Sequence, residues 1–151
     1  MPERTKLAPS ELSIYELSSG ARDVEVRRAS DWLEDACRKK GVPPTQVDRL
    51  VLCLNEVLAN IIAHGKPTQP ITLRLEVGAD PHSSEASVTV ADACRAFDPL
   101  SVPKRARPAS LDEAPTSGMG LDIIRFCSDV LRYRHEGGRN HLTFGARWKA
   151  E

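Results

Sequence analysis

The most regular pattern in the chain covers residues 45–62, where apolar side chains recur at the i, i+3, i+4, i+7 spacing of one helical face. Thr45 follows two prolines and has a side chain suited to cap the N-terminus of that helix. A second, looser helical pattern covers residues 21–40 and stops at Gly41. The apolar positions therefore predict two consecutive helices in the first half of the chain.

Elsewhere the apolar and polar residues alternate, as they do in strands with one buried face. This alternation predicts five strands, at residues 12–17, 71–77, 86–90, 130–134 and 141–148. The last two are separated by Gly137 and Gly138, which favour a tight hairpin turn. A short apolar helix is expected from residue 117, after an irregular, proline-rich segment at 99–117 that predicts a long loop.

The order of these elements suits a layer of helices that covers one face of a mostly antiparallel sheet. The predicted fold class is therefore α+β, a two-layer sandwich. With 151 residues, of which 40% are hydrophobic and 28% charged, the chain can bury one ordinary core. We expect a single domain over residues 1–151.

The net charge of the chain limits the classes of partner that it can attract. The 21 basic and 21 acidic residues cancel, so no overall field draws the molecule to nucleic acid or to an anionic membrane. The N-terminus lacks the apolar core of a signal peptide, and the longest strongly apolar run, at 50–54, is too short to span a bilayer. Four cysteines occur without a C-x-x-C pair, which is typical of reduced, structural thiols. These features predict a cytoplasmic protein with no membrane or direct nucleic-acid partner.

Three polar residues lie opposite the apolar face of the 45–62 helix: Glu56, Asn60 and His64 follow one another at i, i+4, i+8. Such a stripe is often no more than a solvated face. Here its neighbours include Ala59 and Ala63, where a wet face would have several charged residues, so we expect something to cover this side. A carboxylate and an amide one turn apart can polarise a nucleophile and supply an oxygen to Mg²⁺.

Asp92 ends an apolar strand just before the long loop. Acidic residues in that place are commonly turn formers. At the bottom of a pocket, however, the carboxylate can accept the exocyclic amino hydrogen of adenine, which guanine does not offer at the same position, and Phe97 can form a wall against the base. This interpretation predicts selection of ATP over GTP.

The segment Ser117-Gly118-Met119-Gly120-Leu121 places two glycines before a helix. Backbone N–H groups and the helix N-terminus can then approach phosphate oxygens without obstruction by side chains. The alternative is a flexible hinge.

Taken in order, these motifs resemble those of the GHKL ATPases. The segment from Glu56 to His64 resembles their N box, residues 92–99 their first glycine box, 118–121 their second, and the 99–117 loop, with Lys104, Arg105 and Arg107, their ATP lid. Within that superfamily, residues 121–133 and 138–142 are most similar to bacterial anti-sigma-factor serine kinases of the RsbW and SpoIIAB type.

The resemblance implies ATP and Mg²⁺ as cofactors and assigns roles to particular residues. Glu56 would be the general base, Asn60 would coordinate Mg²⁺, and Asp92 would bind adenine. The other nucleotide-binding residues that it implies are Ala63, Phe97, Ser117, Gly118, Gly120, Leu121 and Thr143.

The function implied is that of a partner-switching kinase. Such a protein binds a sigma factor or another regulator and transfers the γ-phosphate of ATP to a Ser or Thr of a STAS-domain antagonist; relatives of this kind also form homodimers. The chain departs from the family pattern at Cys94 and Ala96, which stand where the first glycine box has glycines. Two alternatives therefore stay open: a non-catalytic module that sequesters a regulator, and an ATP hydrolase without a protein acceptor.

Overall fold

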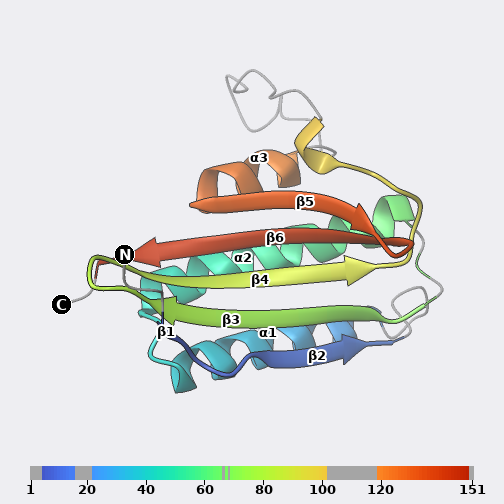
Figure 1. The fold of residues 1–151 in the computed structure, drawn as a ribbon. Coiled ribbons are helices and arrows are strands. Elements are labelled where there is room, and N and C mark those ends of the chain that lie inside the picture. Colours follow the sequence, from blue (N-terminus) through green and yellow to red (C-terminus); the bar gives the residue numbers. More distant parts are fainter. Residues whose placement is uncertain (1–4, 16–21, 66, 68, 102–118, 150–151) are drawn as a thin grey trace, which may run out of the picture.

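The computed structural model describes residues 5–15, 22–65, 67, 69–101 and 119–149. Within these ranges, helices cover one face of a six-stranded sheet (Figure 1). The strands are β1 (Thr5–Lys6), β2 (Ser10–Ile14), β3 (Ile71–Ala79), β4 (Ser84–Asp92), β5 (Val130–Glu136) and β6 (Arg139–Trp148). The helices are α1 (Arg22–Lys39), α2 (Pro44–Asn60) and α3 (Met119–Cys127). The predicted α+β, two-layer sandwich is confirmed.

The sheet has the order β1-β3-β4-β6-β5, and β2 pairs with the same edge of β3 as β1 does. All the pairings between the described strands are antiparallel. The predicted glycine turn closes the β5–β6 hairpin, where Gly137 and Gly138 have φ of 63° and 73°. Both values lie in the left-handed region that glycine adopts without a steric cost, and they suit the twist of a two-residue hairpin.

Alternation along β4 places one set of side chains in the core. Ala86, Val88 and Val90 are at most 1% exposed and pack under the helices. Because side chains two residues apart in a strand point to the same side, Asp92 at the end of β4 also points to the helical side of the sheet. Strand β4 thus places apolar side chains in the core and a carboxylate at the edge of the core.

Helix α2 differs from its prediction at both ends. Its N-cap is Pro43, with an extended ψ of 148° and no side-chain cap bond, so the expected capping role of Thr45 was wrong. Pro44 takes the first turn instead, where its missing N–H would have no helical partner anyway. At the other end, α2 continues into a π-helical turn over Ile61–Gly65, which the sequence did not indicate.

Helix α3 is fastened to α2 near its C-terminal end. The Nε of Arg49 donates to the carbonyl of Cys127 at 3.0 Å, and the same guanidinium pairs with Asp129 at 3.3 Å. The Cys53 thiol also lies 3.5 Å from the Ser128 hydroxyl. These contacts fix α3 beside α2 at the β5 end of the sheet (Figure 1). None of the helices in the described ranges is long and apolar enough to cross a membrane.

Candidate functional site

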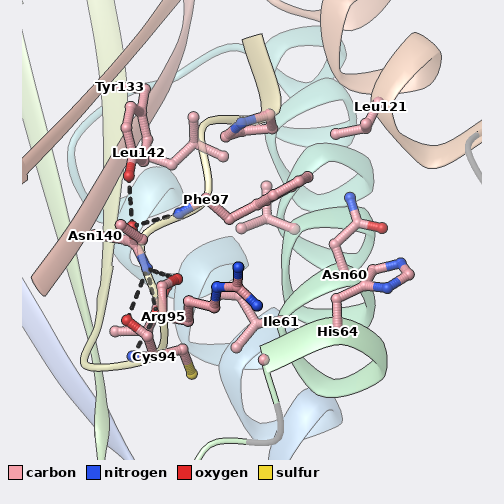
Figure 2. Close-up of a pocket in the computed structure, with 15 residues that line it drawn as sticks. Asn60, Ile61, His64, Cys94, Arg95, Phe97, Leu121, Tyr133, Asn140 and Leu142 are labelled. Carbon is pink, nitrogen blue, oxygen red and sulfur yellow. Dashed lines mark hydrogen bonds between the residues drawn. The ribbon is translucent and has the colours of Figure 1, made fainter. Parts of the chain in front are cut away.

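A cavity of about 290 Å³ opens where β4 and α2 end, at the same edge of the sheet. The turn that follows β4 forms one side of it and the end of α2 forms the other (Figure 2). Its lining is mostly apolar with a few convergent polar groups, as in sites for small ligands. The lining residues are Val57, Asn60, Ile61, His64, Gly65, Asp92, Cys94, Arg95, Ala96, Phe97, Pro99, Leu121, Tyr133, Asn140 and Leu142.

Asp92 lines this cavity and is only 6% exposed. Its Oδ1 accepts hydrogen bonds from the Cys94 backbone N–H at 2.9 Å and from Asn140 Nδ2 at 3.0 Å. No N–H group of the residues that the structure describes donates to its Oδ2, and the Cys94 side chain also hydrogen-bonds the carboxylate. The carboxylate therefore has one oxygen committed to the protein and one left to receive a hydrogen from a ligand.

Asn140 holds the cavity wall together, and sequence reasoning gave it no role. Its Nδ2 also donates to the carbonyls of Arg95 at 3.0 Å and Cys94 at 3.3 Å, while its Oδ1 accepts from the Phe97 N–H at 3.2 Å and the Tyr133 hydroxyl at 2.5 Å. Burial raises the pKa of Tyr133, which keeps the phenol protonated as a donor. The signal for this role lies in strand register, because Asn140 stands opposite Asp92 in the β4–β6 pair.

Replacing Asn140 by alanine is expected to lower the free energy of unfolding by about 2–4 kcal/mol, because it leaves several buried polar partners unpaired. Denaturant unfolding monitored by circular dichroism measures this change. His141→Ala is the matched control, since His141 is the next residue of β6 and its side chain lies on the sheet face away from the helices. Equal losses in the two variants would contradict the role assigned to Asn140.

The three residues of the polar stripe on α2 do not all lie at the cavity. Asn60 and His64 line the cavity, whereas Glu56 lies one turn earlier, is partly buried and does not line it. Helical spacing puts Glu56 between Asn60 and Cys53, and Cys53 contacts the end of α3. Glu56 is thus placed on the side of α2 that leads from the cavity toward α3.

Two residues implied as nucleotide contacts lie elsewhere. Ala63 lines a separate groove between α1 and α2, together with Ala59 one turn earlier on the same side of the helix. Thr143 lies on the sheet face opposite the helices, where its hydroxyl is 2.8 Å from that of Thr89. Strand alternation explains this position: the neighbouring Leu142 points into the cavity, so Thr143 cannot.

The departures from the first glycine box are accommodated in the fold. A Cβ built on Gly65 would lie 2.8 Å from the Cys94 Sγ and 3.1 Å from its Cβ. The missing side chain at Gly65 therefore leaves room for the one present at Cys94. Burial raises the pKa of the Cys94 thiol to about 11, so it stays neutral at physiological pH. Cys94 is a packed wall of the cavity, and the cavity persists beside it.

This packing predicts a compensating pair. Gly65→Ala is expected to lower the free energy of unfolding by about 1–3 kcal/mol through overpacking, and Cys94→Gly in the same chain should recover part of that loss. Unfolding of both single variants and the double variant in denaturant measures the coupling. If the changes in the free energy of unfolding of the two single variants simply add in the double variant, the contact between positions 65 and 94 contributes nothing to stability.

The structure describes only some of the remaining predicted residues. Phe97 and Leu121 line it, Gly120 is in the first turn of α3, and Ser117 and Gly118 lie outside the described residues. Of the proposed lid, the structure describes only a 3-10 turn at Pro99–Ser101. The Nη2 of Arg125 on α3 donates to the carbonyl of Pro99 at 3.3 Å, which ties this turn to the helix that follows the glycine motif.

Mg²⁺, which the family resemblance implies, takes oxygen ligands. Within the described ranges, no group of three or more His, Cys, Asp or Glu side chains could hold a metal ion. Asn60 is nonetheless on the cavity wall and offers an amide oxygen. This arrangement fits Mg²⁺, which is commonly held by one or two protein ligands together with substrate phosphates.

The chain is similar to known proteins in sequence and in fold. The sequence profile of the histidine kinase-like ATPase domain matches residues 20–145. The serine/threonine-protein kinase BtrW of Bordetella bronchiseptica is 35% identical over 113 residues, which are 74% of this chain and 78% of that protein. The solved RsbU and RsbW domains of Rv1364c from Mycobacterium tuberculosis share the fold, with a TM-score of 0.64 and 14% identity over 96% of this chain and 34% of that one. Since the profile covers most of the sequence, the chain belongs to the histidine kinase-like ATPase family.

Proposed function

We propose that this chain is an ATP-dependent serine/threonine protein kinase of a partner-switching system. It binds ATP with Mg²⁺ in the cavity and transfers the γ-phosphate to a Ser or Thr of a STAS-domain antagonist. Its other partner is a sigma factor or another regulator of that kind. The resemblance to anti-sigma-factor kinases and the similarity to a serine/threonine kinase support this proposal.

The arrangement of Asp92 carries the proposal. Its Oδ1 is held by the Cys94 N–H and Asn140, which leaves Oδ2 as an acceptor in a mostly apolar cavity. Adenine presents an amino donor where guanine presents a carbonyl oxygen, and two facing acceptors repel each other. Phe97, half exposed on the cavity wall, offers an aromatic surface against the base. The site therefore suits adenine and disfavours guanine.

The polar end of α2 supplies the groups for phosphoryl transfer. When bound, Mg²⁺ would neutralise phosphate charge, with the Asn60 amide oxygen as one of its ligands. Glu56, a turn away, takes the proton of the attacking Ser or Thr hydroxyl. The hydroxyl oxygen then forms a bond to the γ-phosphorus as the bond to the ADP oxygen breaks. Transfer to water in place of a hydroxyl would use the same residues and give a hydrolase.

Calorimetry with Mg-ATP and Mg-GTP tests the nucleotide site directly. We expect ATP to bind and GTP to bind at least about tenfold more weakly, the difference that one unfavourable polar contact produces. Incubation with γ-labelled ATP and a candidate STAS-domain protein then tests phosphoryl transfer, with an acceptor Ser→Ala variant as the control. ATP binding without phosphate transfer to a protein acceptor or to water would overturn the kinase proposal.

A second candidate function is a module that sequesters a regulator without using nucleotide. Cys94 and Ala96, in place of glycines, favour it. The absence of ATP binding at millimolar concentrations would support this candidate over the kinase. Cys94→Gly is then the first substitution to make, because restored binding would attribute the loss to that side chain.

A further inference from the structure

Arg95 is a charged residue of the cavity lining. It lies in the turn after β4, lines the cavity and is exposed. Its guanidinium forms no hydrogen bond or ion pair with the residues that the structure describes. This contrasts with Arg49, Arg74, Arg125 and Arg147, each of which has a carboxylate or carbonyl partner.

The backbone of this turn is held in place, which sets the direction of the Arg95 side chain. The Arg95 carbonyl accepts from Asn140 Nδ2 at 3.0 Å, so the backbone of Arg95 is anchored to β6. Figure 2 shows the side chain extending from the turn toward the end of α2 that bears Asn60 and His64. The guanidinium is thereby directed toward Asn60, the residue proposed above to hold Mg²⁺ together with the phosphates (Figure 2).

The charges of the cavity lining indicate what kind of ligand group Arg95 can bind. Arg95 is the one Lys or Arg among the lining residues that the structure describes, and Asp92 contributes a negative charge. A polyphosphate placed beside a carboxylate is repelled unless a cation compensates. Guanidinium groups bind phosphate oxygens through two parallel N–H donors, and such charge-assisted bonds are about twice as strong as neutral ones.

We propose that Arg95 is a phosphate-binding residue that contacts the phosphate chain of the bound nucleotide. The inference rests on the proposed function and deepens it, since it assigns phosphate binding to a side chain in the turn after β4. The hydrogen bonds of the Cys94 N–H and of Asn140 hold the turn after β4 in place. The Arg95 side chain extends from this turn and places its positive charge near the ligand.

The experiment compares adenosine, ADP and ATP as ligands of wild type, Arg95→Gln and Arg95→Lys by calorimetry. Arg95→Gln is expected to weaken ADP and ATP about tenfold or more and to leave adenosine affinity unchanged, because only the phosphates meet the guanidinium. Arg95→Lys should recover part of the affinity, since it keeps the charge and loses the paired donors. Arg132→Gln is the matched control, because Arg132 is exposed on β5 and absent from the cavity lining.

The outcomes separate this inference from the proposed function. Wild type and Arg95→Gln with equal ATP affinity would overturn the role of Arg95 and leave the nucleotide site intact. An equal loss for adenosine and ATP would also overturn it, because the substitution would then act through the shape of the turn. If wild type binds none of the three ligands, the proposed function fails and the inference fails with it.

Discussion

The affinity for Mg-ATP is expected to fall at least about 100-fold when Asp92 is replaced by asparagine, which corresponds to about 2.7 kcal/mol. The substitution keeps the shape of the side chain. The Cys94 N–H and Asn140 Nδ2 both donate to the Oδ1 position, so the network fixes the amide oxygen there. The new NH₂ group then faces the cavity and meets the amino group of adenine, so that a donor opposes a donor.

The same substitution should change nucleotide choice as well as affinity. An NH₂ group at this place matches the carbonyl oxygen of guanine, so we expect the ratio of GTP to ATP affinity to rise. Calorimetry with both nucleotides measures the ratio, and thermal unfolding checks that the variant folds. Thr143→Val is the control, because Thr143 lies on the opposite face of the sheet. Unchanged ATP affinity in Asp92→Asn would remove adenine recognition from this residue.

The second large effect is expected at Glu56. Glu56→Gln should lower the rate of phosphoryl transfer about 10²- to 10⁴-fold, because a neutral amide cannot take the proton of the attacking hydroxyl. The affinity for ATP should change little, since Glu56 does not line the cavity. Single-turnover transfer from γ-labelled ATP, with protein in excess over nucleotide, measures the chemical step apart from product release.

A matched control for Glu56 exists on the neighbouring helix. Glu34 is also a partly buried helical glutamate, but it lines the groove between α1 and α2, on the other side of the helical layer. Glu34→Gln should transfer phosphate at the wild-type rate. Equal rates for wild type and Glu56→Gln would exclude Glu56 as the base, and a large loss of ATP affinity in Glu56→Gln would make it a binding residue instead.

Local sequence patterns were sufficient for the elements of this fold because each has a strong period. The i, i+3, i+4 repeat located α2, the alternation located β3 to β6, and two glycines located the last hairpin turn. The sequence did not predict β1, placed β2 at 12–17 instead of Ser10–Ile14, and missed both ends of α2. Pro43 rather than Thr45 caps α2, and the π-helical turn at Ile61–Gly65 left no trace in the apolar pattern, because it depends on packing against the rest of the chain.

Short motifs with their own local geometry brought four of the predicted residues to one cavity. Asn60, Asp92, Phe97 and Leu121 reach one cavity as expected. Ala63 and Thr143 do not, because the rotation of a helical turn and the alternation of a strand decide which side a residue faces. A shift of one position along a strand reverses that side.

The sequence by itself determined the fold class, the family and the residue types available for nucleotide chemistry, since these depend on periodicity and short motifs. Tertiary structure alone decided three features: the five hydrogen bonds of Asn140, the room that Gly65 leaves for Cys94, and the position of Arg95 at the cavity without a partner for its guanidinium among the described residues. Apart from the Tyr133–Asn140 bond within the β5–β6 hairpin, these contacts join residues that are between 29 and 48 positions apart, and Arg95 lies in a turn that such a contact holds. Contacts of that range are set by strand register and helix packing, which no local pattern encodes.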